Sequence, residues 1–151
     1  MGALFLYKNN SNIDLLNVEK LFLEKGFAKP QRFTTNNYSA LLYSKILAGH
    51  PNFIKTENGF IAGIGTYVYK KLSPFKSLEL LLNDFRSNTF IPDELLGSFW
   101  VLYFDGIKLS FLTDRSAIQN IFYTADKNVI TSSFLSAVYS YNESLTLNKK
   151  S

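Results

Sequence analysis

Hydrophobic and polar positions follow one another in short blocks, each about as long as one strand or one helix. Residues Ala3 to Lys8 predict a short buried strand that starts close to the N-terminus. From about Asp14 to Lys25 the apolar residues recur on one helical face, at Leu15, Val18 and Phe22. The chain is therefore expected to open with a strand followed by an amphipathic helix.

The middle of the chain has a ragged strand pattern from Arg32 to Ile54, strongest from Ser39 to Leu47. Asn58-Gly59 stands between two apolar pairs, which predicts a hairpin with a type I′ turn. Phe60 to Tyr69 is then expected to be a strand.

Two glycines interrupt that strand, in the tripeptide Gly63-Ile64-Gly65. Glycine inside a strand indicates either a bulge or a close backbone approach, and both readings stay open. The tripeptide is not a dinucleotide-binding fingerprint, because Val68 occupies the third glycine position.

A second helix is expected after Ser73-Pro74, an N-cap residue followed by proline at the first helical position, and it runs to about Arg86. Ser98 to Phe104 and Ile107 to Leu112 then predict a hairpin joined by the two-residue loop Asp105-Gly106. The other expected elements are short: a helical turn from Pro92 through Leu96, a turn at Thr113–Ser116, a strand pair at Asn120–Tyr123 and Asn128–Thr131, and a helix starting in Phe134–Tyr141.

Composition narrows the class of protein. With 151 residues, 46% hydrophobic and 16% aromatic, the chain predicts one α+β domain with a substantial sheet core. It has no Cys, which excludes a disulfide scaffold, a thiolate metal site and a cysteine nucleophile. His50 is the single histidine, so multi-histidine metal motifs are excluded, and a structural or exposed position is favoured for it over a catalytic role.

Neither the charge of the chain nor its targeting signals indicate a nucleic-acid or membrane partner. The formal net charge is +4, but the cations are scattered, whereas nucleic-acid binding needs a patch or stripe. No apolar run approaches a transmembrane helix, and the N-terminus lacks a signal peptide. The expectation is a cytoplasmic protein with no nucleic-acid or membrane partner.

Four segments, in order, carry a resemblance to a known family. They are LLGSFWVLYFDG at residues 95–106, KLSFLTDR at 108–115, NIFY at 120–123 and ITSSFLSA at 130–137. Together they resemble the N-terminal class II glutamine amidotransferase domain of asparagine synthetase-like proteins. The resemblance implies the N-terminal-nucleophile hydrolase fold, a four-layer αββα sandwich of two antiparallel sheets between helices.

The resemblance also implies a site, of which the main residue is missing. Gly2 stands where the family has its nucleophilic cysteine, so no catalytic residue is expected. Asn58-Gly59 is the one Asn-Gly pair available as the family's oxyanion donors, and the pair is our candidate for ligand binding; a plain hairpin turn is the alternative. Arg32 is not assigned to the family's carboxylate-binding arginine, and Asp114 and Arg115 are read as a structural turn.

The sequence thus predicts a single degenerate glutaminase-like domain over residues 1–151, the N-terminal part of a longer synthetase-like protein. It would be a structural partner, in cis or in trans, of an ATP-dependent amide-forming half, and ATP and Mg²⁺ would belong to that half. One alternative is a stand-alone module that binds glutamine, another amino acid or a protein. Another is an active enzyme in which Gly2 replaces a native cysteine.

Overall fold

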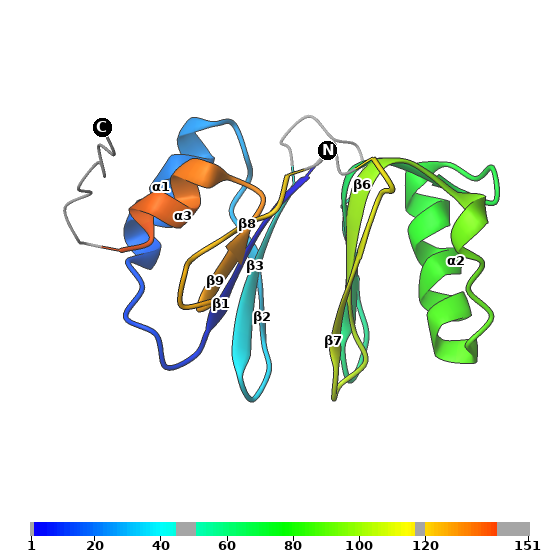
Figure 1. The fold of residues 1–151 in the computed structure, drawn as a ribbon, viewed down its shortest axis with the longest axis horizontal. Coiled ribbons are helices and arrows are strands. Elements are labelled where there is room, and N and C mark those ends of the chain that lie inside the picture. Colours follow the sequence, from blue (N-terminus) through cyan, green and yellow to red (C-terminus); the bar gives the residue numbers. More distant parts are fainter. Residues whose placement is uncertain (1, 45–50, 117–119, 142–151) are drawn as a thin grey trace, which may run out of the picture.

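The computed structural model describes residues 2–44, 51–116 and 120–141. Two antiparallel β-sheets lie face to face, with helices on their outer faces, so the layers run helix, sheet, sheet, helix (Figure 1). The predicted α+β class is confirmed.

The first sheet has five strands in the order β2-β3-β1-β9-β8. Its members are β1 (Gly2–Lys8), β2 (Gln31–Thr34), β3 (Tyr38–Ser44), β8 (Phe122–Tyr123) and β9 (Val129–Thr131). The opening strand β1 is central, because it pairs with β3 from Gly2↔Ser44 to Lys8↔Tyr38 and with β9 on its other edge. α1 (Leu15–Glu24) and α3 (Phe134–Tyr139) cover the outer face of this sheet (Figure 1).

The second sheet has four strands in the order β4-β5-β6-β7. They are β4 (Phe53–Lys55), β5 (Phe60–Tyr69), β6 (Leu95–Phe104) and β7 (Leu109–Thr113). α2 (Pro74–Ser87) covers the outer face, and the 3₁₀ turn η1 (Pro92–Glu94) leads into β6 (Figure 1).

Three apolar layers hold the four layers of structure together, as expected when each sheet buries both faces. The layer between the sheets includes Leu4 and Leu42 from the first sheet and Phe60, Trp100 and Leu102 from the second. α1 packs Val18 and Phe22 against the first sheet, and α2 packs an apolar stripe against the second.

The expected helices and long strands form with bounds close to those predicted, with three differences. The helical turn predicted from Pro92 through Leu96 ends at Glu94, because Leu95 and Leu96 already pair with β5 as the start of β6. The other two differences are turns. Neither Asn58 nor Gly59 has the positive φ that a type I′ turn requires, so that turn type is wrong, although β4 and β5 do form the hairpin. The prediction of a two-residue loop at Asp105-Gly106 is also wrong. The loop has four residues, 105–108, because the Asp105 carboxylate accepts hydrogen bonds from the backbone N–H groups of Ile107 (2.8 Å) and Lys108 (2.7 Å).

The glycines of β5 resolve the alternative left open between a bulge and a close approach. β5 and β6 pair without interruption from Phe60↔Phe104 to Tyr69↔Leu95. Gly65 has a φ of +93°, and a Cβ there would lie 2.2 Å from the Ser98 carbonyl oxygen. Close backbone approach is therefore the reason for glycine at this position. Among the described residues, no helix is long and apolar enough to cross a membrane.

Candidate functional site

Position 2, where the resemblance implies a nucleophile, lies at the start of the central strand β1. Gly2 pairs with Ser44 of β3. A Cβ on Gly2 would lie 1.8 Å from Asn52 Nδ2, 2.4 Å from Asn52 Cγ and 2.8 Å from the Tyr43 carbonyl oxygen. All three distances are shorter than van der Waals contact, so position 2 has no room for a side chain while Asn52 keeps this position.

Asn52 is the residue that fills this space, and the sequence pattern did not single it out. It lies immediately before β4 and is half-buried. Its Oδ1 accepts a hydrogen bond from Ser44 Oγ (2.8 Å), and its Nδ2 donates to the Gly63 carbonyl oxygen (3.3 Å). Its own carbonyl oxygen accepts from the Gly63 N–H (2.8 Å). Asn52 therefore links β3 of one sheet to β5 of the other.

Asn58 and Gly59 lie in the β4–β5 loop, closed by a hydrogen bond from the Thr56 N–H to the Gly59 carbonyl oxygen (2.9 Å). Gly59 stands four residues before Gly63, the neighbour of Asn52, which is about 13 Å along a strand. The structure thus does not bring the Asn-Gly pair together with Gly2. The pair instead lines a small cavity of about 190 Å³ with Arg32 and Phe104.

Arg32 lies on the edge strand β2, where its guanidinium forms an ion pair with Glu19 of α1. Its side chain is 55% exposed, in keeping with a solvated surface position. His50 lies outside the described residues.

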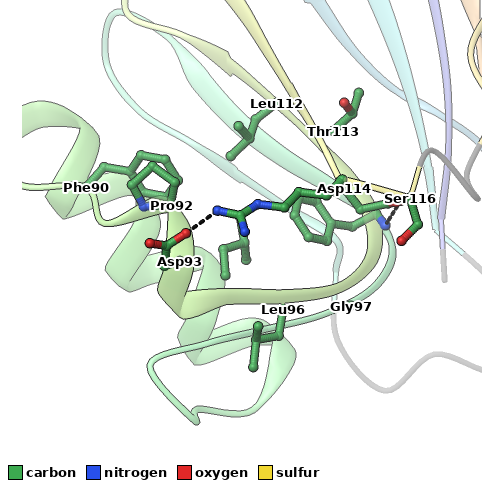
Figure 2. Close-up of a pocket in the computed structure, with 12 residues that line it drawn as sticks. Phe90, Pro92, Asp93, Leu96, Gly97, Leu112, Thr113, Asp114 and Ser116 are labelled. Atoms are coloured by element: carbon green, nitrogen blue, oxygen red, sulfur yellow. Dashed lines mark hydrogen bonds and ion pairs between the residues drawn. The ribbon is translucent and has the colours of Figure 1, made fainter.

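Asp114 and Arg115 follow β7 and line a cavity of about 450 Å³ beside η1 and the start of β6. Figure 2 shows Pro92 and Asp93 across this cavity from Asp114 and Ser116. Asp114 is buried, and its Oδ2 accepts a hydrogen bond from the Phe99 N–H (3.0 Å), while its own N–H donates to the Phe99 carbonyl oxygen (3.0 Å). Arg115 forms an exposed ion pair with Asp93 (Figure 2). Asp114 therefore extends the pairing of β6 beyond the end of β7.

A second group of polar side chains joins β5 to α2. Asp84 Oδ2 accepts hydrogen bonds from Tyr69 Oη (2.6 Å) and Lys70 Nζ (2.8 Å), and its Oδ1 accepts one from Thr89 Oγ1 (3.2 Å). The Lys70 bond, followed by the Tyr69 bond, holds the pKa of Asp84 below its ordinary value, and the bond to Asp84 raises the pKa of Lys70. All the members of this group are satisfied by one another, which favours a structural role.

Within residues 2–44, 51–116 and 120–141, no three His, Cys, Asp or Glu side chains are grouped so as to hold a metal ion. The scan against protein-family models, the search of curated proteins and the search of solved structures each found no match to this chain.

Proposed function

We propose that the chain is a degenerate class II glutamine amidotransferase-like domain with the N-terminal-nucleophile hydrolase fold. It releases no ammonia from glutamine. Its role is that of a structural partner, in cis or in trans, which packs on the ATP-dependent synthetase half of an asparagine synthetase-like, amide-forming protein.

The observation that carries the proposal is the state of position 2. Nucleophilic catalysis on an amide needs a side-chain nucleophile held beside a base. Gly2 stands at that point with no side chain, and Asn52 occupies the space in which one would stand. The whole chain contains no Cys that could act in its place.

The layered architecture adds support. Two antiparallel sheets face each other between helices, and the opening strand is central in its sheet. This is the arrangement that the resemblance implies, with position 2 at one end of the layer between the sheets. In this proposal ATP and Mg²⁺ bind to the synthetase half and not to this domain.

The test of the catalytic part is an ammonia-release assay with millimolar glutamine, with asparagine as a second substrate and heat-unfolded protein as the blank. The expected rate equals that of the blank. Ammonia released above the blank by the folded chain would overturn the proposal, because this chain would then act without a side chain at position 2.

The test of the partner part is the coding sequence that follows Ser151. A synthetase half with a Ser-Gly-Gly pyrophosphate-binding loop supports the proposal. A natural stop codon directly after Ser151, with no such gene beside it, contradicts the partner role and favours a stand-alone module.

A stand-alone binding module is the second candidate, favoured by the 450 Å³ cavity beside η1. This volume lies within the range of small-molecule sites. The discriminating measurement is thermal unfolding with and without glutamine, glutamate and asparagine. A ligand present at 100 times its dissociation constant would add about 2.7 kcal/mol to the stability. A clear upward shift without ammonia release supports the module.

A further inference from the structure

Asn52 combines two properties: its carboxamide stands where a side chain at position 2 would stand, and both ends of that carboxamide are hydrogen-bonded. We propose that Asn52 is an internal occupant that closes the position-2 site, and that the pocket around it is specific for a primary carboxamide. The inference rests on the proposed function for the meaning of position 2 and goes beyond it by naming the residue that closes the site and the chemistry of the closure.

The polarity of the pocket determines what it accepts. The Gly63 carbonyl oxygen can only accept a hydrogen bond, so the group facing it must be an N–H donor, which is Asn52 Nδ2. The Ser44 hydroxyl donates to the opposite end, Asn52 Oδ1. An acceptor and a donor at these two places complement a primary carboxamide. A carboxylate has no N–H to offer the Gly63 carbonyl.

The hydrogen bonds of Asn52 that close the position-2 site also join the two sheets. Ser44 ends β3 in the first sheet, and Gly63 lies inside β5 of the second. A second bond, from the Gly63 N–H to the Asn52 carbonyl oxygen, fixes the backbone of Asn52 beside β5. The space that a reactive side chain would need is thus used for a structural joint between the sheets.

The first experiment measures the coupling between positions 2 and 52 with the variants Gly2→Ala, Asn52→Gly and the double variant, by urea unfolding. We expect Gly2→Ala to lower the unfolding midpoint strongly in the natural background, because its Cβ collides with Asn52. In the Asn52→Gly background the same change is expected to lower the midpoint by less than half as much. A part of the effect persists, because the Tyr43 carbonyl oxygen lies 2.8 Å from that Cβ.

Gly106→Ala is the matched control. Gly106 has a φ of +100°, and a Cβ there would lie 2.8 Å from the Asn58 carbonyl oxygen, a strain in which Asn52 takes no part. The cost of Gly106→Ala is therefore expected to be the same with and without Asn52→Gly. An equal cost of Gly2→Ala in both backgrounds would overturn the proposal.

The second experiment probes the chemistry with acetamide, which has the shape of the asparagine side chain, and with acetate as its isosteric control. Acetamide is expected to raise the unfolding midpoint of Asn52→Gly, acetate is expected to raise it less, and the natural protein is expected to respond to neither. If Asn52→Gly does not fold, Asn52→Ala with formamide and formate takes its place.

If acetamide raised the unfolding midpoint of the natural protein as much as that of the variant, the proposal that Asn52 closes the site would be overturned. An equal response of the variant to acetamide and acetate, or no response to either, would overturn the carboxamide specificity. The ammonia assay on the natural protein is independent of these results, so a failure of the proposed function is seen separately.

Discussion

Gly2 and Gly59, one in each sheet layer, are both too crowded for a Cβ, but different kinds of atom crowd them. At Gly2 the nearest atom belongs to the side chain of Asn52, at 1.8 Å. At Gly59 the nearest atom is the backbone carbonyl oxygen of Phe104, at 2.0 Å. Gly2 lies beside Asn52, which joins the two sheets through its hydrogen bonds to Ser44 and Gly63. Gly59 lies where the β4–β5 loop packs on the β6–β7 loop.

The difference separates a closed site from a requirement of the fold. A side chain is removed by one substitution, so most of the crowding at Gly2 depends on the identity of residue 52, and only the Tyr43 carbonyl oxygen at 2.8 Å remains without it. The Phe104 carbonyl belongs to the ladder of β6 and is present whatever the sequence. Glycine at position 59 is therefore explained by the packing of the hairpin alone, without a ligand.

The largest expected effect tests this backbone crowding. Gly59→Ala places a methyl group against the Phe104 carbonyl, and relief needs a shift of the backbone at the β4–β5 loop. We expect a loss of about 3 kcal/mol in the free energy of unfolding, at the upper end of the usual cost of overpacking. Urea unfolding followed by tryptophan fluorescence measures it, since Trp100 is buried in the layer between the sheets.

Asn58→Ala is the control for that variant. Asn58 is an exposed residue of the same loop, so its truncation is expected to change the stability by less than about 0.5 kcal/mol. A Gly59→Ala variant as stable as Asn58→Ala would contradict the comparison between the two glycines.

Much of the fold could be predicted, because it depends on local sequence patterns. α1 and α2 have apolar residues at the helical period, β1 and β5 are nearly continuous apolar runs typical of buried strands, and each formed close to its predicted bounds. The four-layer arrangement came from the ordered resemblance and not from periodicity, because pairing distant strands is a tertiary event.

The site could not be predicted in the same way. Asn52 acts through Gly2 and Gly63, which lie 50 and 11 residues away in the sequence, and no local pattern relates them. The prediction of the Asp105-Gly106 turn failed for a related reason. The Asp105 carboxylate bonds two backbone N–H groups and thereby selects a four-residue loop, although Asp-Gly alone favours two residues.

The next effect in size concerns the buried carboxylate of Asp114, which bonds Phe99 of β6. Asp114→Ala leaves the buried Phe99 N–H without its 3.0 Å acceptor, which is expected to cost about 2 kcal/mol. Arg115→Ala removes an exposed ion pair with Asp93 and is expected to cost less than about 0.5 kcal/mol. Thermal unfolding of both variants measures the difference. Equal losses would contradict a structural role confined to Asp114.

A smaller effect is expected at the joint itself. Ser44→Ala removes the hydroxyl that donates to Asn52 Oδ1 and leaves the bond to Gly63 in place. The expected loss is about 1 kcal/mol, the usual net contribution of one hydrogen bond. Ser87→Ala, at the exposed end of α2, is the matched control and should be nearly neutral. If the two variants are equally stable, the Asn52 carboxamide is not held from the Ser44 side.

The smallest effect is a local one at low pH, which should distinguish the Gly59 end from the Gly2 end. Hydrogen bonds from the backbone N–H groups of Lys108 and Ile107 hold the pKa of Asp105 below its ordinary value. A depressed carboxyl pKa contributes stability that is complete above the unfolded value of about 4 and is lost as the pH falls through the folded pKa.

Amide hydrogen exchange, expressed as protection factors, measures this loss at each end. Protection of the Ile107 and Lys108 N–H groups is expected to fall as the pH is lowered below about 4. The Leu4 N–H donates to Ser132 Oγ, which does not ionise, so its protection should stay constant. Asp105→Asn keeps an oxygen acceptor without the titration and should remove the pH dependence. An equal fall at Leu4 would mean that acid loosens the whole domain and not the Asp105 loop.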